Sequence, residues 1–135
     1  MILLDSSLII AYSNKVDQNH NKALKIVEDI VKEKYGTPAI TDYIFDETIT
    51  VMTIKTKDLT RIAESGSRLL EANVLLRIDE QTFQQAWKIF KDQQKPHLSF
   101  TDCTTIAACK TNGIPNLATF DEDFRRILGL RIIGL

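Results

Sequence analysis

Four carboxylates stand far apart in this sequence, at positions where their oxygens could meet: Asp5, Glu47, Asp102 and Asp121. Asp5 and Asp121 each follow a short apolar run expected to be a strand, whereas Glu47 and Asp102 lie near the starts of expected helices. In an open parallel sheet, the carboxyl ends of the strands and the starts of the helices that follow them share one edge. We therefore expect all four side chains at one rim of the fold.

Each acid also has a simpler explanation, and both explanations stay open at this point. Asp5, Asp102 and Asp121 could cap helices, since Ser99 followed by Asp102 has the spacing of a capping box. Glu47 could be an ordinary surface residue. Capping explains where each acid lies along the chain, but it does not explain why the acids would meet at one edge.

A group of carboxylates at one place has definite chemistry. Like charges within several Å raise one another's pKa and disfavour ionisation unless a cation lies between them. Oxygen ligands without His or Cys suit Mg²⁺ or Mn²⁺. Such ions can activate a water, neutralise phosphoryl oxygens and stabilise a leaving oxygen, so phosphodiester hydrolysis would need no histidine base.

The elements that must position these acids alternate between short apolar strands and helices. Strands are expected at 1–4, 37–40, 74–78, 116–120 and 130–133, the last at a sheet edge. Helices are expected at 8–14, from Asp17 to Gly36, from 42 after a Thr41 cap, at 59–71, after an Asp79 cap and after Ser99. This alternation predicts an α/β fold with a mainly parallel central sheet. The polar connection at 91–96 is too short to divide the chain, so 1–135 is expected to be one domain.

Composition limits the function. The formal net charge of −1 excludes attraction of nucleic acid by the overall charge of the protein. A divalent cation is therefore again favoured as the charge that attracts a phosphate. Residues 1–4 are apolar but are followed at once by Asp5, so we expect neither a signal peptide nor a membrane span. Cys103 and Cys109 lie roughly 240° apart around one expected helix and cannot pair with each other. They are expected to be small buried thiols in a reducing, cytoplasmic compartment.

Four segments, in order, resemble the acidic motifs of the PIN-domain family: Asp5-Ser6-Ser7, residues 43–48 around Glu47, Thr101-Asp102-Cys103 and residues 118–124 around Asp121. The resemblance covers essentially the whole chain, and its length is similar to that of VapC-type toxins and related archaeal single-domain proteins. It implies a three-layer fold and a metal-dependent ribonuclease with Asp5, Glu47, Asp102 and Asp121 as catalytic and metal-binding acids. It also implies Asp123 as an accessory metal ligand, with the Ser6 and Thr119 hydroxyls orienting the acids.

The resemblance further implies an RNA substrate, an antitoxin partner and a homodimer formed through the helices at 26–31 or 44–52. The alternative is a PIN-like module that binds RNA or protein without cutting. A haloacid-dehalogenase-type phosphatase would require an acid at the position of Ser7, and a P-loop enzyme would require a glycine-rich loop that this sequence lacks. The sequence therefore argues against both classes. RNA cleavage by the purified protein separates the nuclease from the binding module.

Overall fold

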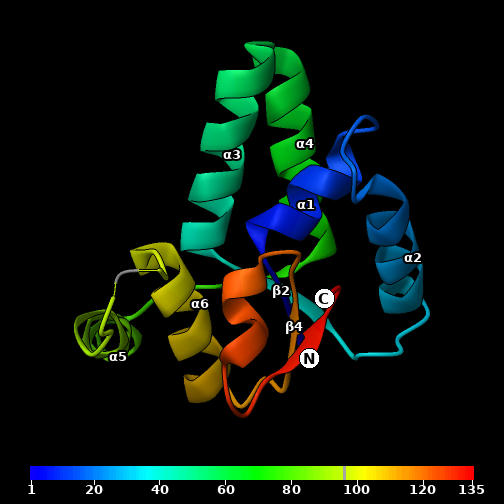
Figure 1. Cartoon of the computed structure of the whole chain (residues 1–135). Helices are drawn as coiled ribbons and strands as arrows, with labels where there is room; N and C mark the ends of the chain where they lie inside the picture. The colour runs from blue at the N-terminus through cyan, green and yellow to red at the C-terminus, as the bar shows by residue number, and fades with distance from the viewer. Residues whose placement is uncertain (96) are drawn as a thin grey trace.

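The computed structural model describes residues 1–95 and 97–135 and has three layers (Figure 1). Within these residues, five strands form the sheet: β1 (Ile2–Leu4), β2 (Pro38–Thr41), β3 (Val74–Leu76), β4 (Asn116–Ala118) and β5 (Arg131–Ile133). The α-helices are α1 (Ser6–Ser13), α2 (His20–Val31), α3 (Asp42–Thr56), α4 (Leu59–Ala72), α5 (Glu80–Lys91) and α6 (Phe100–Thr111). A 3₁₀ helix, η1 (Glu122–Arg126), lies between β4 and β5. The polar connection predicted at 91–96 overlaps the end of α5 and runs to residue 96, outside the described residues.

The strand order is β3-β2-β1-β4-β5, and every neighbouring pair is parallel. This confirms the predicted α/β class, and β5 lies at an edge as expected. The chain builds outward from β1 through β2 to β3, then returns to the other side of β1 with β4. The strand order therefore reverses between β1 and β4, and the crevice beyond the carboxyl ends of these two strands is where ligands bind in open parallel sheets.

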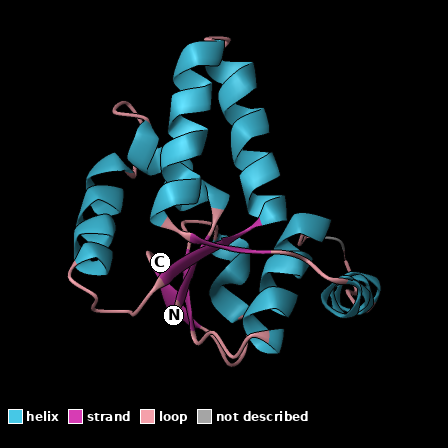
Figure 2. Ribbon diagram, turned by 180° about the vertical axis from the view of Figure 1, so that it is seen from behind, coloured by secondary structure: helices cyan, strands magenta, loops and turns pink. Residues whose placement is uncertain are grey.

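Alternate side chains of the sheet pack into two hydrophobic cores, one on each face of the sheet. Leu3, Ala39 and Leu117 pack with the buried residues of α5, α6 and η1. Ile2, Ile40 and their neighbours pack with α1, α2 and the first turn of α3 on the other face. Strands covered on both faces are expected to be apolar throughout, as β1 is. The α3–α4 hairpin stands up from this double-sided core in both views (Figures 1 and 2).

Three predicted helix caps are confirmed. The Thr41 hydroxyl accepts a hydrogen bond from Ile44 N at 3.0 Å, and the Asp79 carboxylate accepts one from Thr82 N at 2.8 Å. Ser99 and Asp102 form the full capping box at the start of α6. These caps define where α3, α5 and α6 leave the sheet edge, because each satisfies an otherwise free N–H group of the first turn.

The predicted limits of the second helix are wrong. The Asp17 carboxylate accepts from Asn19 N at 2.8 Å, a local turn that delays the start of α2 to His20. The helix ends at Val31, because Glu33 adopts a left-handed conformation with φ 59°. Lys34 N donates to Asp29 O and Glu33 N to Ile30 O, so Glu33 takes the helix-ending position predicted for Gly36.

The apolar side chains of α2 are only partly buried. Ala23 and Ile30 lie in the core, but Leu24 is 43% exposed and Val31 is 76% exposed. The first helix also begins earlier than predicted, at Ser6 in place of Leu8, because Asp5 caps it. Among the described residues, no helix is long and apolar enough to cross a membrane.

Candidate functional site

Three of the four predicted acids stand where the strand order reverses. Asp5 directly follows β1, Asp121 is the third residue after β4, and Asp102 lies in the first turn of α6. Glu47 comes from the second turn of α3, whose preceding strand β2 is the other neighbour of β1. The β1–β4 and β1–β2 pairings thus bring four distant parts of the sequence to the carboxyl edge of the sheet.

Asp5 is the most buried of these acids, with 3% of its surface exposed. Its Oδ2 atom accepts hydrogen bonds from the Ser7 hydroxyl at 2.5 Å and from the Thr119 hydroxyl at 2.7 Å. Ser7 N also donates to Oδ2, at 3.3 Å. Three donors on one oxygen hold the carboxylate in a single orientation, and none of the hydrogen bonds found in residues 1–95 and 97–135 engages Oδ1.

Glu47 is held from the neighbouring helix. The Ser6 hydroxyl at the start of α1 donates to Glu47 Oε2 at 2.5 Å. This bond joins the element after β1 to the element after β2, so Glu47 is not an isolated surface acid. A charge-assisted bond of this kind orients a carboxylate more strongly than a bond between neutral groups.

Asp102 is part-buried at the start of α6. Its Oδ2 accepts from Ser99 N at 2.7 Å, while Asp102 N donates to the Ser99 hydroxyl at 3.1 Å. Burial, together with the negative charges of Asp5 and Asp121, raises the pKa of Asp102 to about 6, against the hydrogen bonds from Ser99 that lower it. Asp5, Asp102 and Asp121 therefore interact electrostatically across the rim.

Asp121 and Asp123 lie on the segment that leaves β4. Asp121 Oδ1 accepts from Asp123 N at 2.9 Å and caps η1. Asp121 N donates to the Thr119 hydroxyl at 2.9 Å, so Thr119 connects the backbone at Asp121 to the carboxylate of Asp5. Asp123 itself is exposed at the beginning of η1.

The four acids share one arrangement. In each, the described residues engage one carboxylate oxygen by hydrogen bonds and leave the other without one: Asp5 Oδ1, Glu47 Oε1, Asp102 Oδ1 and Asp121 Oδ2. Four hard oxygens on oriented carboxylates fit the ligand preference of Mg²⁺ or Mn²⁺. Within the part of the chain that the structure describes, no three acidic, histidine or cysteine side chains lie close enough together to hold one ion.

An acid can cap a helix and also belong to the group of acids at the rim. Asp5, Asp102 and Asp121 each accept a backbone hydrogen bond at the start of a helix, as the simpler explanation expected. Glu47 does not cap a helix and is held by Ser6. A carboxylate has two oxygens, so one can complete a cap while the other faces the rim.

Ser7 is a residue that the sequence analysis left without a role. Its hydroxyl donates to Asp5, accepts from Phe120 N at 3.0 Å and lies 3.1 Å from the Thr119 hydroxyl. In the sequence, the position of Ser7 in the polar pair Ser6-Ser7, directly after Asp5, could have indicated this role. Successive residues at a helix start point in different directions, and Ser6 turns to Glu47 while Ser7 turns to Asp5.

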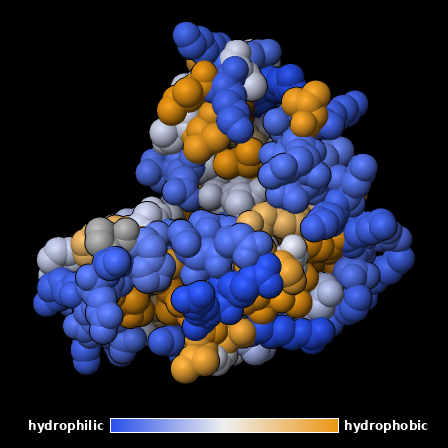
Figure 3. All heavy atoms as spheres, viewed as in Figure 1, coloured by the Kyte–Doolittle hydropathy of each residue, from blue (hydrophilic) through white to orange (hydrophobic). Residues whose placement is uncertain are grey.

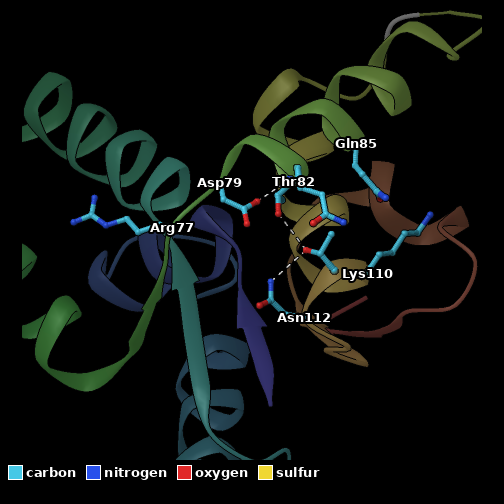
Figure 4. A pocket seen from close by; sticks show the side chains of 8 residues that line it. Arg77, Asp79, Thr82, Gln85, Lys110 and Asn112 are labelled. Carbon is cyan, nitrogen blue, oxygen red and sulfur yellow. Dashed lines mark hydrogen bonds between the residues drawn. The ribbon is translucent and has the colours of Figure 1, made fainter.

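A polar pocket of about 360 Å³ lies elsewhere, between the start of α5 and the end of α6 (Figure 4). The described residues that line it include none of the four acids. Thr82 bonds to the Asp79 carboxylate through its backbone N–H, and its hydroxyl lies 3.3 Å from that of Thr111. The Arg77 side chain points away from this network in Figure 4. The close approach of the Thr82 and Thr111 hydroxyls joins α5 to α6 at this pocket.

Comparison with known proteins places this geometry in a family. A model described as PIN domain matches residues 2–130. The 23S rRNA-specific endonuclease VapC20 of Mycobacterium tuberculosis is 26% identical over 127 residues, which cover 92% of each chain. Its crystal structure, described as that of a sarcin-ricin loop cleaving toxin, aligns with a TM-score of 0.79 and 22% identity over 93% of each chain.

A toxin–antitoxin complex from Klebsiella pneumoniae shares the fold with a TM-score of 0.71 and 17% identity, over 97% of this chain and 96% of that one. These structural likenesses establish the arrangement of strands and helices. The family model spans β1 through the segment after η1, and it therefore includes all four acids. The chain belongs to the PIN domain family.

Proposed function

We propose that this protein is a metal-dependent endoribonuclease of the VapC toxin type, with residues 1–135 forming one nuclease domain. The observation that carries the proposal is the convergence of Asp5, Glu47, Asp102 and Asp121 at the carboxyl edge of the sheet, each with one oriented and one free oxygen. The 23S rRNA-specific endonuclease VapC20, related over 92% of both chains, supports RNA as the substrate.

Each acid has a distinct role in the proposal. Asp5 and Asp102 are the central ligands of Mg²⁺ or Mn²⁺, because each leaves the rigid end of an element. Glu47 and Asp121 complete the ligand set, and the exposed Asp123 is an accessory ligand. The hydroxyls of Ser6 and Thr119 orient Glu47 and Asp5 through the hydrogen bonds described above.

When bound, the divalent cation supplies positive charge for the phosphate and activates a water for attack on phosphorus. The chain's own part is to aim the carboxylates. Three donors hold Asp5 Oδ2, which leaves Oδ1 as the ligating atom. Burial and the charges of Asp5 and Asp121 raise the pKa of Asp102 to about 6, and a bound cation would offset those charges and so favour the ionised carboxylate.

The proposal includes an antitoxin partner, supported by the toxin–antitoxin complex among the solved structures of this fold. It also includes a homodimer through the helices at 26–31 or 44–52. Val31 is 76% exposed and available to a second copy, whereas Ile44 is fully buried in the chain's own core. Apolar surface also covers part of the α3–α4 hairpin in Figure 3, where Ile54 is 70% exposed.

A reducing, cytoplasmic location is the last part of the proposal. Cys103 and Cys109 are both free and buried in α6. Burial raises the pKa of the Cys103 thiol to about 11 and that of Cys109 to about 12, so both remain protonated and unreactive near neutral pH.

The deciding experiment compares the wild type with Asp5→Asn on a mixed single-stranded RNA with Mn²⁺. The amide keeps the size of the side chain and its ability to cap α1, but it removes the charge that a hard cation requires. We expect cleavage to be lost while circular dichroism melts show a folded protein. Asp46→Asn is the matched control, since it removes an exposed carboxylate of α3 next to Glu47.

Equal cleavage by the wild type and Asp5→Asn would overturn the proposed mechanism. Metal-dependent cleavage lost equally in Asp46→Asn would mean that net charge matters and the acidic quartet does not. No cleavage by any of the three proteins, with RNA still bound, would establish the non-catalytic PIN-like module instead.

A further inference from the structure

A cluster of aromatic side chains borders the acidic rim: Tyr43, Phe83, Trp87, Phe90 and Phe100, here called the aromatic surface. We propose that it binds unstacked bases of single-stranded RNA next to the phosphate to be cleaved. The proposal rests on the proposed function for its substrate class, but it concerns residues outside the acidic quartet and its hydroxyl partners.

Phe100 is the centre of the aromatic surface. Its ring meets Phe83 edge-to-face with centroids 5.1 Å apart, and Tyr43 and Trp87 in the same manner at 6.1 and 6.3 Å. Trp87 in turn stacks on Phe90, with centroids 5.7 Å apart and planes at 11°. These contacts hold the rings in fixed orientations, so they form a preorganised surface.

The outer rings of this surface are not needed to fill the core. On α5, Thr82 and Ala86 are the buried residues, whereas Phe83 is 38% exposed and Trp87 is 43% exposed. Figure 3 shows apolar residues among polar ones at the lower left, over α5 and α6. Adjacent large rings in contact with water are characteristic of binding surfaces in otherwise polar exteriors.

Two rings of the aromatic surface belong to helices that also carry acids of the rim. Phe100 opens α6 two residues before Asp102, and Tyr43 lies on α3 one turn before Glu47. A ring contact between Tyr43 and Phe100 therefore joins the starts of the two helices that carry these acids. An RNA strand whose phosphate lies against the acids would pass its neighbouring bases over Phe100 toward α5.

Charge on α5 and the segment after it complements a phosphate backbone. From Glu80 to Leu98 the sequence contains three lysines and two acids, Glu80 and Asp92, in a chain whose net charge is −1. Lys88 and Lys91 are exposed on α5, and the Lys91 ammonium lies 5.7 Å from the centroid of the Trp87 ring. Because the Trp87 side chain is 43% exposed, a base that took the place of the Lys91 ammonium over this ring would bring its phosphate to Lys91.

Base stacking on aromatic rings tolerates any sequence, because every base has a π-face. It requires unpaired bases, since the faces of paired bases are already stacked in a duplex. The aromatic surface therefore favours a single-stranded loop or end over a helix, which is the form in which proteins read RNA most readily. This selects the substrate by structure and leaves catalysis to the acids.

Trp87 is the single tryptophan of the chain, so its fluorescence reports directly on this surface. The experiment titrates the protein, in EDTA to prevent cleavage, with a labelled single-stranded RNA of about ten nucleotides, a length within the site sizes of stacking-type binders. We expect saturable quenching of Trp87, and less quenching with the same RNA in a duplex. Trp87→Ala should weaken binding by roughly 5- to 100-fold, measured by fluorescence anisotropy, and Trp87→Phe should restore most of it.

Val16→Ala is the matched control, because Val16 is an 89% exposed apolar residue on the loop between α1 and α2. Unquenched Trp87 fluorescence at saturating RNA would overturn the proposal even if Trp87→Ala failed to fold. So would a folded Trp87→Ala protein with wild-type affinity. If sedimentation showed that Trp87→Ala turns a dimer into a monomer without changing RNA affinity, the surface would bind a second copy instead.

Failure of the proposed function has a different signature. If RNA quenches the Trp87 fluorescence and RNA affinity depends on Trp87, but no RNA is cleaved with Mn²⁺, the result supports RNA binding by the aromatic surface and rejects the nuclease function. A protein that cleaves through Asp5 without any contribution of Trp87 to affinity supports the nuclease and rejects the aromatic surface.

Discussion

The Thr119 hydroxyl donates a hydrogen bond to Asp5 Oδ2 at 2.7 Å, between residues 114 positions apart in the sequence. The same hydroxyl accepts from Asp121 N at 2.9 Å. One fully buried side chain thereby couples the carboxylate after β1 to the backbone of the acid after β4. The parallel pairing of β1 with β4 makes this contact possible, since it aligns Leu4, the residue before Asp5, with Ala118, the residue before Thr119.

Thr119→Val should therefore be costly to stability. The methyl group that replaces the hydroxyl has a similar shape, but it leaves Asp121 N without its acceptor and Asp5 without one donor. We expect a loss of about 1–3 kcal/mol in the free energy of unfolding, measured by urea denaturation. RNA cleavage should fall as well, because Asp5 is less well oriented.

Thr48→Val is the matched control for this change. Thr48 is equally buried, but its hydroxyl is a buried group without a hydrogen-bond partner in the described residues. Removing it should leave the free energy of unfolding unchanged or raise it by about 1 kcal/mol. If both variants lost the same stability, the Thr119 hydrogen bonds would not be the cause.

Asp102→Asn should stabilise the cation-free protein above pH 6. Burial together with Asp5 and Asp121 raises the pKa of the Asp102 carboxyl to about 6, so folding favours its protonated form. Stability from this group is fully present below the unfolded pKa near 4 and is lost as pH rises through 6. The amide cannot ionise. The free energy of unfolding of Asp102→Asn should therefore exceed that of the wild type by about 1 kcal/mol at pH 8. This value is reduced for solvent screening of a part-exposed group.

Urea unfolding in EDTA at pH 5 and pH 8 tests this effect. The difference between Asp102→Asn and the wild type should grow with pH. Asp46→Asn, which changes an exposed acid, should show no such growth. A constant difference at both pH values would mean that the amide acts through the capping box and not through charge.

Mn²⁺ should raise the melting temperature of the wild type. An ion that binds only the folded state stabilises it by about 1.4 kcal/mol at ten times its Kd, or roughly 5 °C for a chain of this size. Asp5→Asn should remove most of this shift. Equal shifts in both proteins would indicate that the ion binds elsewhere.

Ser6→Ala should lower RNA cleavage about 10- to 100-fold, the usual cost of removing a group that orients a metal ligand. Its hydroxyl donates to Glu47 Oε2 at 2.5 Å. Ser13→Ala, at the exposed end of the same helix, should cut RNA like the wild type. Should the two variants cleave at equal rates, Glu47 would need no support from Ser6.

Local patterns were enough to predict the fold class and most of its elements. The apolar runs that became β1, β2 and β4 are short, and helical segments separate them, which is sufficient for a parallel sheet. The caps Thr41, Asp79 and Ser99 were readable because a cap bonds within three residues of itself. Family resemblance then rested on four short motifs in order, and the family match bears it out.

The end of α2 was not readable in this way. Gly36 is the obvious helix-ending residue, yet Glu33 takes the left-handed position, with φ 59°. That conformation is unfavourable for glutamate by itself and has to be balanced by its surroundings. These surroundings include the ion pair between Lys34 and Asp29, whose atoms lie 2.6 Å apart across the turn.

The partners of each hydroxyl at the rim were decided only by the tertiary structure. The sequence places Ser6, Ser7 and Asp5 side by side, but it does not say that Ser6 turns to Glu47 and Ser7 to Asp5. Those choices depend on the strand order and on how α1 crosses α3, both of which arise from packing the two cores. The acids could be listed from the chain alone because their types and motifs are local. Which oxygen of each is held and which is free depends on contacts between residues up to 114 positions apart.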